Sequence, residues 1–141
     1  MPESSKKYRL SFVIQGGIAK GFKATLEQQT INFHVRKYGD NRPELNDADF
    51  IDKDIGEALE NPDAVYPSLY IDNSGSTLFK KNVYIFYKEK VERRYAKNGK
   101  TIKWYTKVVV RKKWLRKLEV ITPYYSSKIN EEKRCKPITK I

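Results

Sequence analysis

The feature that most constrains the fold of this chain is a pair of long β-type runs in its second half. Residues 82–94 and 101–113 are rich in Val, Ile, Tyr, Phe and Thr, the side chains that favour strands. Asn98 and Gly99 lie between the two runs, and an Asn-Gly pair suits the tight turn of a hairpin. We therefore predict a long antiparallel hairpin.

Shorter patterns predict the remaining elements. Residues 8–14, 65–71 and 118–124 have the apolar and aromatic character of strands. Over residues 22–38 the apolar residues fit a helix in part and a strand in part, and we favour a helix or helical turn over residues 30–38. Apolar residues at helical spacing predict a further helix over residues 50–59. The predicted fold class is α+β, with N-terminal helices packed on a curved four- to five-stranded antiparallel sheet.

The length of 141 residues fits a single domain over residues 1–141. We expect residues 1–7 to be a loose N-terminus and residues 8–64 to hold the first strand and the helices. Residues 65–125 are expected to form the antiparallel sheet, and residues 126–141 a basic tail.

The charge is distributed very unevenly along the chain. The net charge is +12, but residues 1–78 have a balance of −3 and residues 79–141 a balance of +15. A region of one sign attracts polyanions, and nucleic acid gains further affinity from the release of counterions. The predicted partner is therefore nucleic acid, either RNA (such as tRNA or mRNA) or DNA. A solubility device and a dock for an acidic protein are the alternatives.

Composition excludes several classes of function. One histidine and one cysteine cannot supply the ligands of a His/Cys zinc site, and no glycine-rich phosphate-binding loop or dinucleotide motif is present. We expect no cofactor and no metal, and read the acidic residues 40–63 as a solvated helix face rather than a Mg²⁺ or Ca²⁺ site. The lone Cys135 indicates a reducing compartment. No apolar run suits a signal sequence or a membrane span, so a cytoplasmic location without a membrane partner is expected.

Two groups of residues could support phosphate chemistry without a metal. His34 can exchange a proton near neutral pH, since an imidazole has a pKa of about 6.5, although a lone histidine is more often structural. Lys107 interrupts the second β-run, and alternation places it on one face with Tyr105 and Arg111. Such a face could hold phosphates and stack unpaired bases. It could equally be an ordinary solvent-exposed sheet face.

The order of these motifs resembles a known family. A His-Val element at His34 lies near the N-terminal helices, and a helix then ends in Glu-Asn-Pro-Asp at residues 60–63. Residues 107–110 read Lys-Val-Val-Val, and a later strand closes on Thr122 and Tyr124. This order over residues 30–126 resembles the barnase–EndoU–colicin–RelE-like ribonuclease superfamily, and most of all its phage and mobile-element branch.

The resemblance implies a metal-independent endoribonuclease, often a toxin, in which the ribose 2′-OH attacks the adjacent phosphate. It implies His34, Lys107, Thr122 and Tyr124 as catalytic residues. The remaining candidates, chosen by their chemistry as nucleic-acid contacts, are Arg36, Lys37, Arg42, Tyr105, Arg111, Lys112 and Lys113. The chain departs from the family at residues 38–39, where it lacks a second histidine.

Three functions follow as hypotheses. The first is the endoribonuclease, for which an acidic inhibitor, immunity or antitoxin protein would be a natural partner. The second is a non-catalytic nucleic-acid-binding protein that uses the same sheet face. The third is an interaction protein whose basic face docks an acidic protein.

Overall fold

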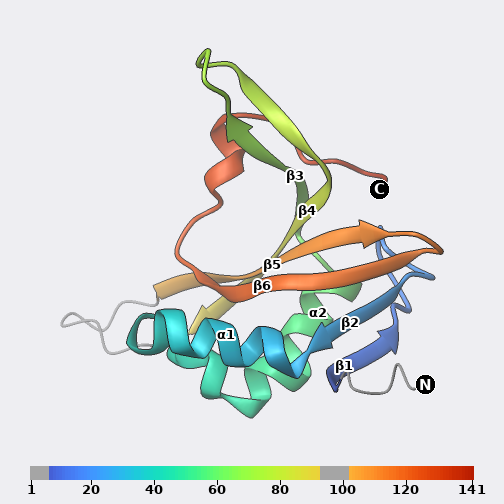
Figure 1. Ribbon diagram of the computed structural model, residues 1–141, viewed down its shortest axis with the longest axis vertical. Helices are drawn as coiled ribbons and strands as arrows, with labels where there is room; N and C mark the ends of the chain where they lie inside the picture. Colours follow the sequence, from blue (N-terminus) through green and yellow to red (C-terminus); the bar gives the residue numbers. More distant parts are fainter. Residues whose placement is uncertain (1–6, 93–101) are drawn as a thin grey trace.

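The protein is a six-stranded mixed sheet with short helices on one side, as seen in a computed structural model that describes residues 7–92 and 102–141 (Figure 1). The strand order is β1-β2-β6-β5-β4-β3. β2 runs parallel to β6, and all other neighbours are antiparallel. The strands are β1 (Tyr8–Val13), β2 (Lys23–Glu27), β3 (Ala64–Ile71), β4 (Thr77–Glu92), β5 (Ile102–Lys113) and β6 (Lys117–Ser126).

The helical elements are short. They are α1 (Gln28–Tyr38), the 3₁₀ turns η2 (Gly39–Asn41) and η3 (Pro43–Asn46), the π-helical turn η4 (Phe50–Asp54), α2 (Ile55–Glu60) and the 3₁₀ turn η5 (Asn130–Lys133). The helices predicted over residues 30–38 and 50–59 are both present, but the second begins as a π-helical turn. Between residues 7–92 and 102–141, every helix is too short and too polar to cross a lipid bilayer.

The predicted fold class was wrong. The sheet has six strands rather than four or five, it contains a parallel pair, and two strands precede the first helix. The missed strand is β2, whose sequence Lys-Ala-Thr-Leu-Glu is only five residues long. Its alternation is nevertheless that of a half-buried strand, because Ala24 and Leu26 are fully buried.

The predicted long hairpin is confirmed in its strands. β4 and β5 pair antiparallel from Val83 opposite Arg111 to Glu92 opposite Ile102. The Asn-Gly turn itself lies outside the described residues. Alternation along β5 places Val108 and Val110 on the helical side, where they pack with Ile55 and Leu59 of α2 in the main core.

A large bulge bends the sheet. Pro67 and Leu69 of β3 face Tyr84 and Phe79 of β4, so four residues of β4 face only Ser68. Inside this bulge Asn82 has a positive φ of 63°. A bulge bends the strand that carries it, and the outer part of the β3–β4 hairpin accordingly stands away from β5 and β6 (Figure 1).

The chain after β6 folds back onto the sheet. The backbone N–H of Ile138 donates to the carbonyl of Val65 on β3, and Ile138 and Ile141 pack against the main core. Within η5, Glu131 is 7% exposed. The predicted basic tail over residues 126–141 therefore begins with the last residue of β6, and the remainder of it packs against β3 and the main core.

Candidate nucleic-acid interface

An open groove lies between the bent β3–β4 hairpin, β5 and η5, on the face of the sheet opposite α2. Its volume is about 640 Å³. Leu69, Ile85 and Val109 give it an apolar lining. We call it the basic groove because five cationic residues also line it, namely Lys80, Lys107, Lys128, Lys133 and Arg134.

The basic groove carries an unbalanced positive charge. Glu131 is the single acidic residue that lines it among the described parts of the chain. Its carboxylate accepts a hydrogen bond of 2.7 Å from the Tyr87 hydroxyl and lies 3.9 Å from the ammonium of Lys107. The other four cations form no ion pair with a described residue. Their charge is therefore available to a polyanion.

Lys107 occupies the centre of a row across three strands. It lies opposite Tyr87 of β4 and Tyr124 of β6, and its Nζ is 5.6 Å and 5.2 Å from the centroids of the two rings. Burial and the hydrogen bond to Glu131 raise the pKa of Tyr87. This hydroxyl therefore stays protonated and donates a hydrogen bond to the carboxylate. A nearly buried ammonium needs a partner of opposite charge, and Glu131 supplies it.

The row continues toward α1 through stacked side chains. The guanidinium of Arg42 lies 4.1 Å from the ring centroid of Tyr124 and 3.8 Å from that of Tyr38. The imidazole of His34 stacks on Tyr38 at 5.7 Å. The fold thus connects four of the predicted site residues, His34, Arg42, Lys107 and Tyr124, through neighbouring contacts.

His34 has a partner that explains it structurally. β6 carries one extra residue, Ile121, where Val109 and Val110 face Thr122 and Val120. An extra residue in a bulge lacks its ladder partner, and the carbonyl of Ile121 instead accepts a hydrogen bond of 2.8 Å from Nε2 of His34. The ring is 8% exposed and does not line the basic groove. These contacts favour a structural role for His34.

The same edge of β6 has a second side-chain partner. β2 pairs with β6 only as far as Glu119, and beyond this point α1 and η3 lie beside the strand (Figure 1). The carboxylate of Glu44 accepts a hydrogen bond of 2.7 Å from the backbone N–H of Tyr125. His34 and Glu44 together satisfy backbone groups that no neighbouring strand reaches.

The remaining predicted residues are distributed around this row. Thr122 is half-buried on β6 opposite Val109, and Tyr105 packs edge-on against Tyr87. Arg36 and Lys37 are exposed on α1 and do not line the groove. Farther along β5, toward its turn into β6, lie Arg111, Lys112 and Lys113.

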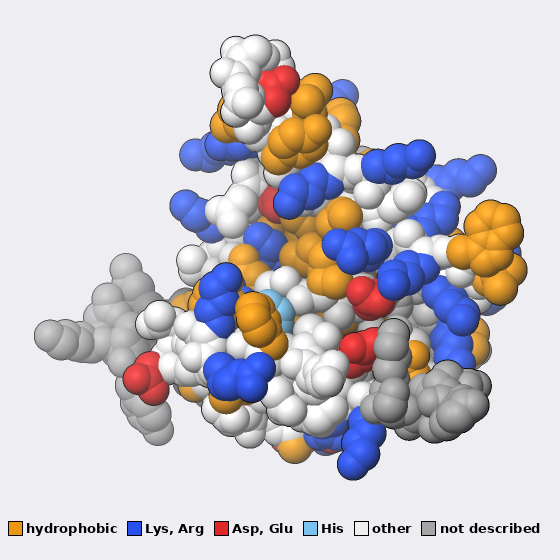
Figure 2. Space-filling view, in the orientation of Figure 1, with side chains coloured by type: hydrophobic (Ala, Val, Ile, Leu, Met, Phe, Trp, Pro, Cys, Tyr) orange, Lys and Arg blue, Asp and Glu red, His pale blue; other side chains and the backbone are white. Residues whose placement is uncertain are grey.

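Figure 2 shows Lys and Arg side chains spread over one face of the molecule, from the β3–β4 hairpin at the top to the β5–β6 turn at the right. The sequence analysis predicted the basic strands but not four cations that line the groove. These are Lys80 and, from the C-terminal segment, Lys128, Lys133 and Arg134. Lys80 lies in the bulge. The only sequence signal for the other three was the basic composition of that segment.

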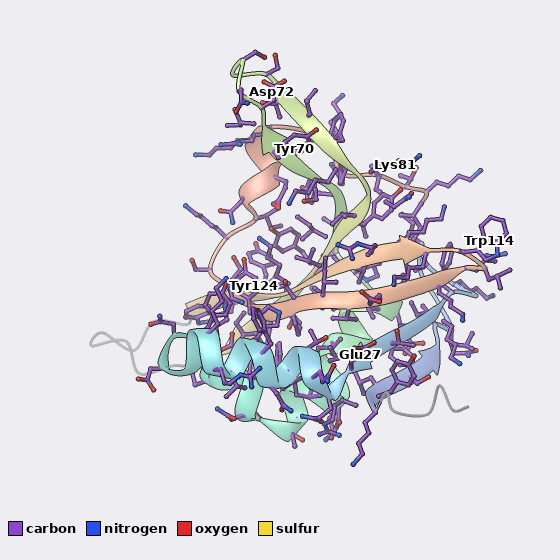
Figure 3. The ribbon with its side chains drawn as sticks, viewed as in Figure 1. Glu27, Tyr70, Asp72, Lys81, Trp114 and Tyr124 are labelled. Carbon is purple, nitrogen blue, oxygen red and sulfur yellow. The ribbon has the colours of Figure 1, made fainter. Side chains whose placement is uncertain are left out.

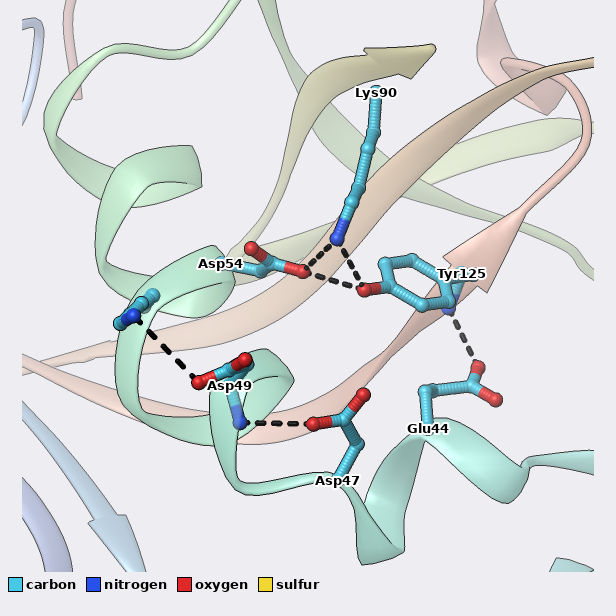
Figure 4. Close-up of polar contacts among 7 residues, drawn as sticks. Glu44, Asp47, Asp49, Asp54, Lys90 and Tyr125 are labelled. Atoms are coloured by element: carbon cyan, nitrogen blue, oxygen red, sulfur yellow. Dashed lines mark hydrogen bonds and ion pairs between the residues drawn. The ribbon is translucent and has the colours of Figure 1, made fainter. Parts of the chain in front are cut away.

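A second polar cluster lies on the opposite face of the sheet (Figure 4). The ammonium of Lys90 donates to Asp54 at 2.7 Å and to the hydroxyl of Tyr125 at 2.9 Å, and this hydroxyl also donates to Asp54. Burial opposes the charge of Lys90, but its hydrogen bonds to Asp54 and Tyr125 outweigh burial and raise its pKa. Burial and the bond to Asp54 also raise the pKa of Tyr125. Each of the three groups is thus hydrogen-bonded to the other two.

Within residues 7–92 and 102–141, no three His, Cys, Asp or Glu side chains are grouped closely enough to hold a metal ion. Comparisons with protein-family models, with curated proteins and with solved structures found no significant match to this chain. The resemblance to the ribonuclease superfamily therefore rests on the sequence motifs alone and stays a prediction.

Proposed function

We propose that this protein binds single-stranded nucleic acid, with RNA as the foremost ligand, along the basic groove. The observation that carries the proposal is the charge of the lining, where four of five cations have no acidic partner among the described residues and the single carboxylate is already engaged. Phosphates that replace small counterions at such a surface gain affinity that depends steeply on salt.

The centre of the groove supports this ligand in a second way. The ammonium of Lys107 is 3.9 Å from Glu131, which is beyond hydrogen-bonding distance. In the part of the chain that the structure describes, no side chain or carbonyl accepts a hydrogen bond from it. A phosphate oxygen would give Lys107 this bond, while the apolar lining would contact a base.

Single strands fit the groove better than duplexes because an unpaired base can be turned toward protein. Ile85 and Val109 lie between the groove's cations, and Tyr105 is half-buried beside the same cluster. An unstacked base has apolar faces that such a surface can cover, whereas a duplex presents mainly phosphates and sugars.

The ribonuclease hypothesis remains a prediction, and one observation keeps it as the second candidate. Lys107, Arg42 and Tyr124 lie in one row and could contact a scissile phosphate. General acid–base catalysis also needs a group within reach of the 2′-OH, and Nε2 of His34 is already bonded to Ile121. We therefore favour binding without cleavage. An acidic inhibitor likewise stays a prediction.

The test is a comparison of two triple variants that lose the same charge. The first removes groove cations (Lys128→Ala, Lys133→Ala and Arg134→Ala). The second removes exposed cations outside the groove (Lys7→Ala, Lys20→Ala and Lys53→Ala). Affinity for a labelled single-stranded RNA is measured by fluorescence anisotropy over a series of salt concentrations.

The groove variant should bind more weakly. Its slope of log K against log salt should be less steep than that of the wild type by about 2, since each of three lost phosphate contacts on a single strand contributes about 0.7. The control variant should keep a slope close to that of the wild type. Equal effects of the two variants would contradict the proposal. Incubation of the same RNA in EDTA separates the two functions, because intact RNA indicates binding and cleaved RNA supports the nuclease.

A further inference from the structure

The turn between β5 and β6 exposes two large apolar side chains. Trp114 is 85% exposed and Leu115 is 72% exposed, more than any other large hydrophobic residue in the described parts of the chain. Figure 3 shows Trp114 at the end of the hairpin, directed away from the body of the protein. Exposed apolar groups of this size often mark a contact surface.

The backbone of this turn is held in an unfavourable conformation. Leu115 and Arg116 have positive φ angles of 63° and 56°, a region that is unfavourable for a residue with a side chain. Tight hairpins usually place Asn or Gly at such positions. Leu115 and Arg116 therefore hold a strained backbone conformation, in a turn where Trp114 and Leu115 are exposed to solvent.

The turn is anchored on one side and free on the other. The carbonyl of Arg116 accepts a hydrogen bond of 2.9 Å from the N–H of Lys23, and its guanidinium lies 5.1 Å from the ring centroid of Phe22. Lys112 approaches the same ring at 5.8 Å. Arg116 and Lys112 thus attach the turn to the rest of the protein, while the side chain of Trp114 stays exposed to solvent.

The charge around the turn is complementary to a polyanion. Lys112, Lys113, Arg116 and Lys117 flank the two apolar residues in sequence. The nearest acidic residue along β6 is Glu119, which lies 2.9 Å from Lys113 and 3.9 Å from Arg111. An exposed aromatic ring with cationic residues on both sides of it in sequence can stack on a base while the cations contact the phosphates.

The turn is also continuous with the basic groove. β5 runs directly from Lys107 in the groove to the turn at Trp114, a distance of about 23 Å at 3.3 Å per residue, and Arg111 lies between them. Figure 2 shows blue side chains over this stretch. This continuity favours a nucleic acid over a lipid surface as the ligand of the turn.

We propose that Trp114 is a base-stacking platform at the far end of a nucleic-acid path that begins in the basic groove. This inference rests on the proposed function and narrows it to strands that are unpaired and long enough to reach both sites. Short oligonucleotides occupy the groove alone, and longer ones add the stacking contact of Trp114.

The experiment compares Trp114→Ala with wild type on single-stranded RNAs from about 4 to about 16 nucleotides, the range of site sizes for such proteins. Short RNAs should bind both proteins equally. On long RNAs Trp114→Ala should lose about 5- to 100-fold in affinity, as expected for one stacked base. Trp114→Phe should recover most of the loss, and duplex RNA should not distinguish the variants.

The matched control is Phe33→Ala, which removes a 50% exposed aromatic residue of α1 that does not line the basic groove and should leave affinity unchanged. In a Trp104→Phe background Trp114 is the sole tryptophan, so its fluorescence should change on binding long RNAs only. Vesicles containing anionic lipid serve as the competing ligand.

Each result supports or overturns one statement. If Trp114→Ala binds long RNA as the wild type does while the groove variant loses affinity, the stacking proposal is wrong and the proposed function stands. If the groove variant binds normally, the proposed function fails instead. Binding of wild type to anionic vesicles that is lost in Trp114→Ala, without any effect on RNA, would overturn the nucleic-acid assignment of the turn.

Discussion

The two faces of the sheet carry clusters made of the same three kinds of side chain, in opposite conditions. On one face Lys90, Asp54 and Tyr125 bond to one another, and the Lys90–Asp54 distance is 2.7 Å. On the other face Lys107 is 3.9 Å from Glu131. One ammonium has its hydrogen bonds supplied by the protein, and the other is held by charge and by aromatic rings.

The difference teaches how the same chemistry can serve structure or binding. The Lys90 cluster ties the π-helical turn η4 to the last residues of β6, and the hydrogen bonds of its three groups run between one another. The Lys107 cluster is more buried but lies in the lining of an open, cation-rich groove. Its unused donor capacity is what a phosphate can take up.

The largest expected effect is that of Glu131→Gln on stability. Loss of the carboxylate leaves the ammonium of Lys107 nearly buried without an opposite charge, which should lower the free energy of unfolding by about 3 kcal/mol. RNA affinity should be kept or raised, because the groove loses the single acidic residue that lines it among the described residues. Urea denaturation and anisotropy measure the two quantities.

The control for this variant is Glu132→Gln, an exposed neighbour whose change should stay within about 0.5 kcal/mol. Lys107→Met added to Glu131→Gln should recover much of the stability, since the unpaired charge is then removed. If Glu131→Gln is as stable as the wild type, the two groups are not coupled.

A smaller loss is expected for Asp54→Asn in the other cluster. Asp54 is 15% exposed and accepts from both Lys90 and Tyr125, and hydrogen bonds to charged groups contribute about 1.5–3 kcal/mol. We expect a loss of about 2 kcal/mol with no change in RNA affinity. Asp49→Asn, which removes an exposed pair with Lys53, should cost less than about 0.5 kcal/mol. Weaker RNA binding by Asp54→Asn would erase the proposed division between the faces.

The pH dependence of stability should have the same sign for both clusters. The folded-state pKa values of Tyr87, Tyr125 and Lys90 are all raised from their usual values of 10.0, 10.0 and 10.5. The unfolded chain therefore releases these protons first, so the stability they contribute is complete below about pH 10 and is lost as the pH rises further. Each group contributes a slope of at most about 1.4 kcal/mol per pH unit.

Denaturation between pH 9 and pH 11 would test this dependence, where the pH limits are set about 1 unit around the usual tyrosine value. Tyr87→Phe and Tyr125→Phe should each flatten the decline above pH 10 by removing one titrating group. An identical decline in the wild type and the double variant would contradict the assignment.

The smallest expected effect is that of His34→Phe. This change keeps an aromatic ring beside Tyr38 but removes the donor to Ile121, at a cost of about 1 kcal/mol. His34→Gln, which retains an N–H donor, should be closer to the wild type. On β6, Tyr124 contacts Lys107 and Tyr125 contacts Lys90. The variant therefore tests whether the hydrogen bond from His34 to Ile121 of the same strand stabilises both clusters. If RNA cleavage is found and both variants abolish it, His34 is a proton-transfer residue after all.

The sequence predicted the elements that have a strong local pattern. β3, β4, β5 and β6 follow from runs of β-branched and aromatic residues, whereas the apolar residues of α1 fitted a helix only in part. β2 was missed because it has only five residues and one of its two neighbours, β6, is far away in sequence, with Lys23 opposite Lys117. Local propensity carries no information about such partners.

The candidate site was predicted in part for the same reason. Alternation along β5 correctly required that Lys107 face solvent, a cleft or a partner, and the structure gives it both a groove and Glu131. The position of Glu131 could not be predicted, because the segment that carries it has no periodic pattern. The exposure of Trp114 was also missed, since it depends on the positive φ angles of the two residues that follow it.

The parallel pairing of β2 with β6 has a consequence for biosynthesis. Lys23 pairs with Lys117, so the sheet joins the beginning of the chain to a strand close to its end. Contacts of such high sequence separation make folding slow. During synthesis β1 and β2 leave the ribosome before β6 exists, so the edge of β2 that pairs with β6 is unpaired at first. A prematurely terminated chain would expose this edge to other nascent chains.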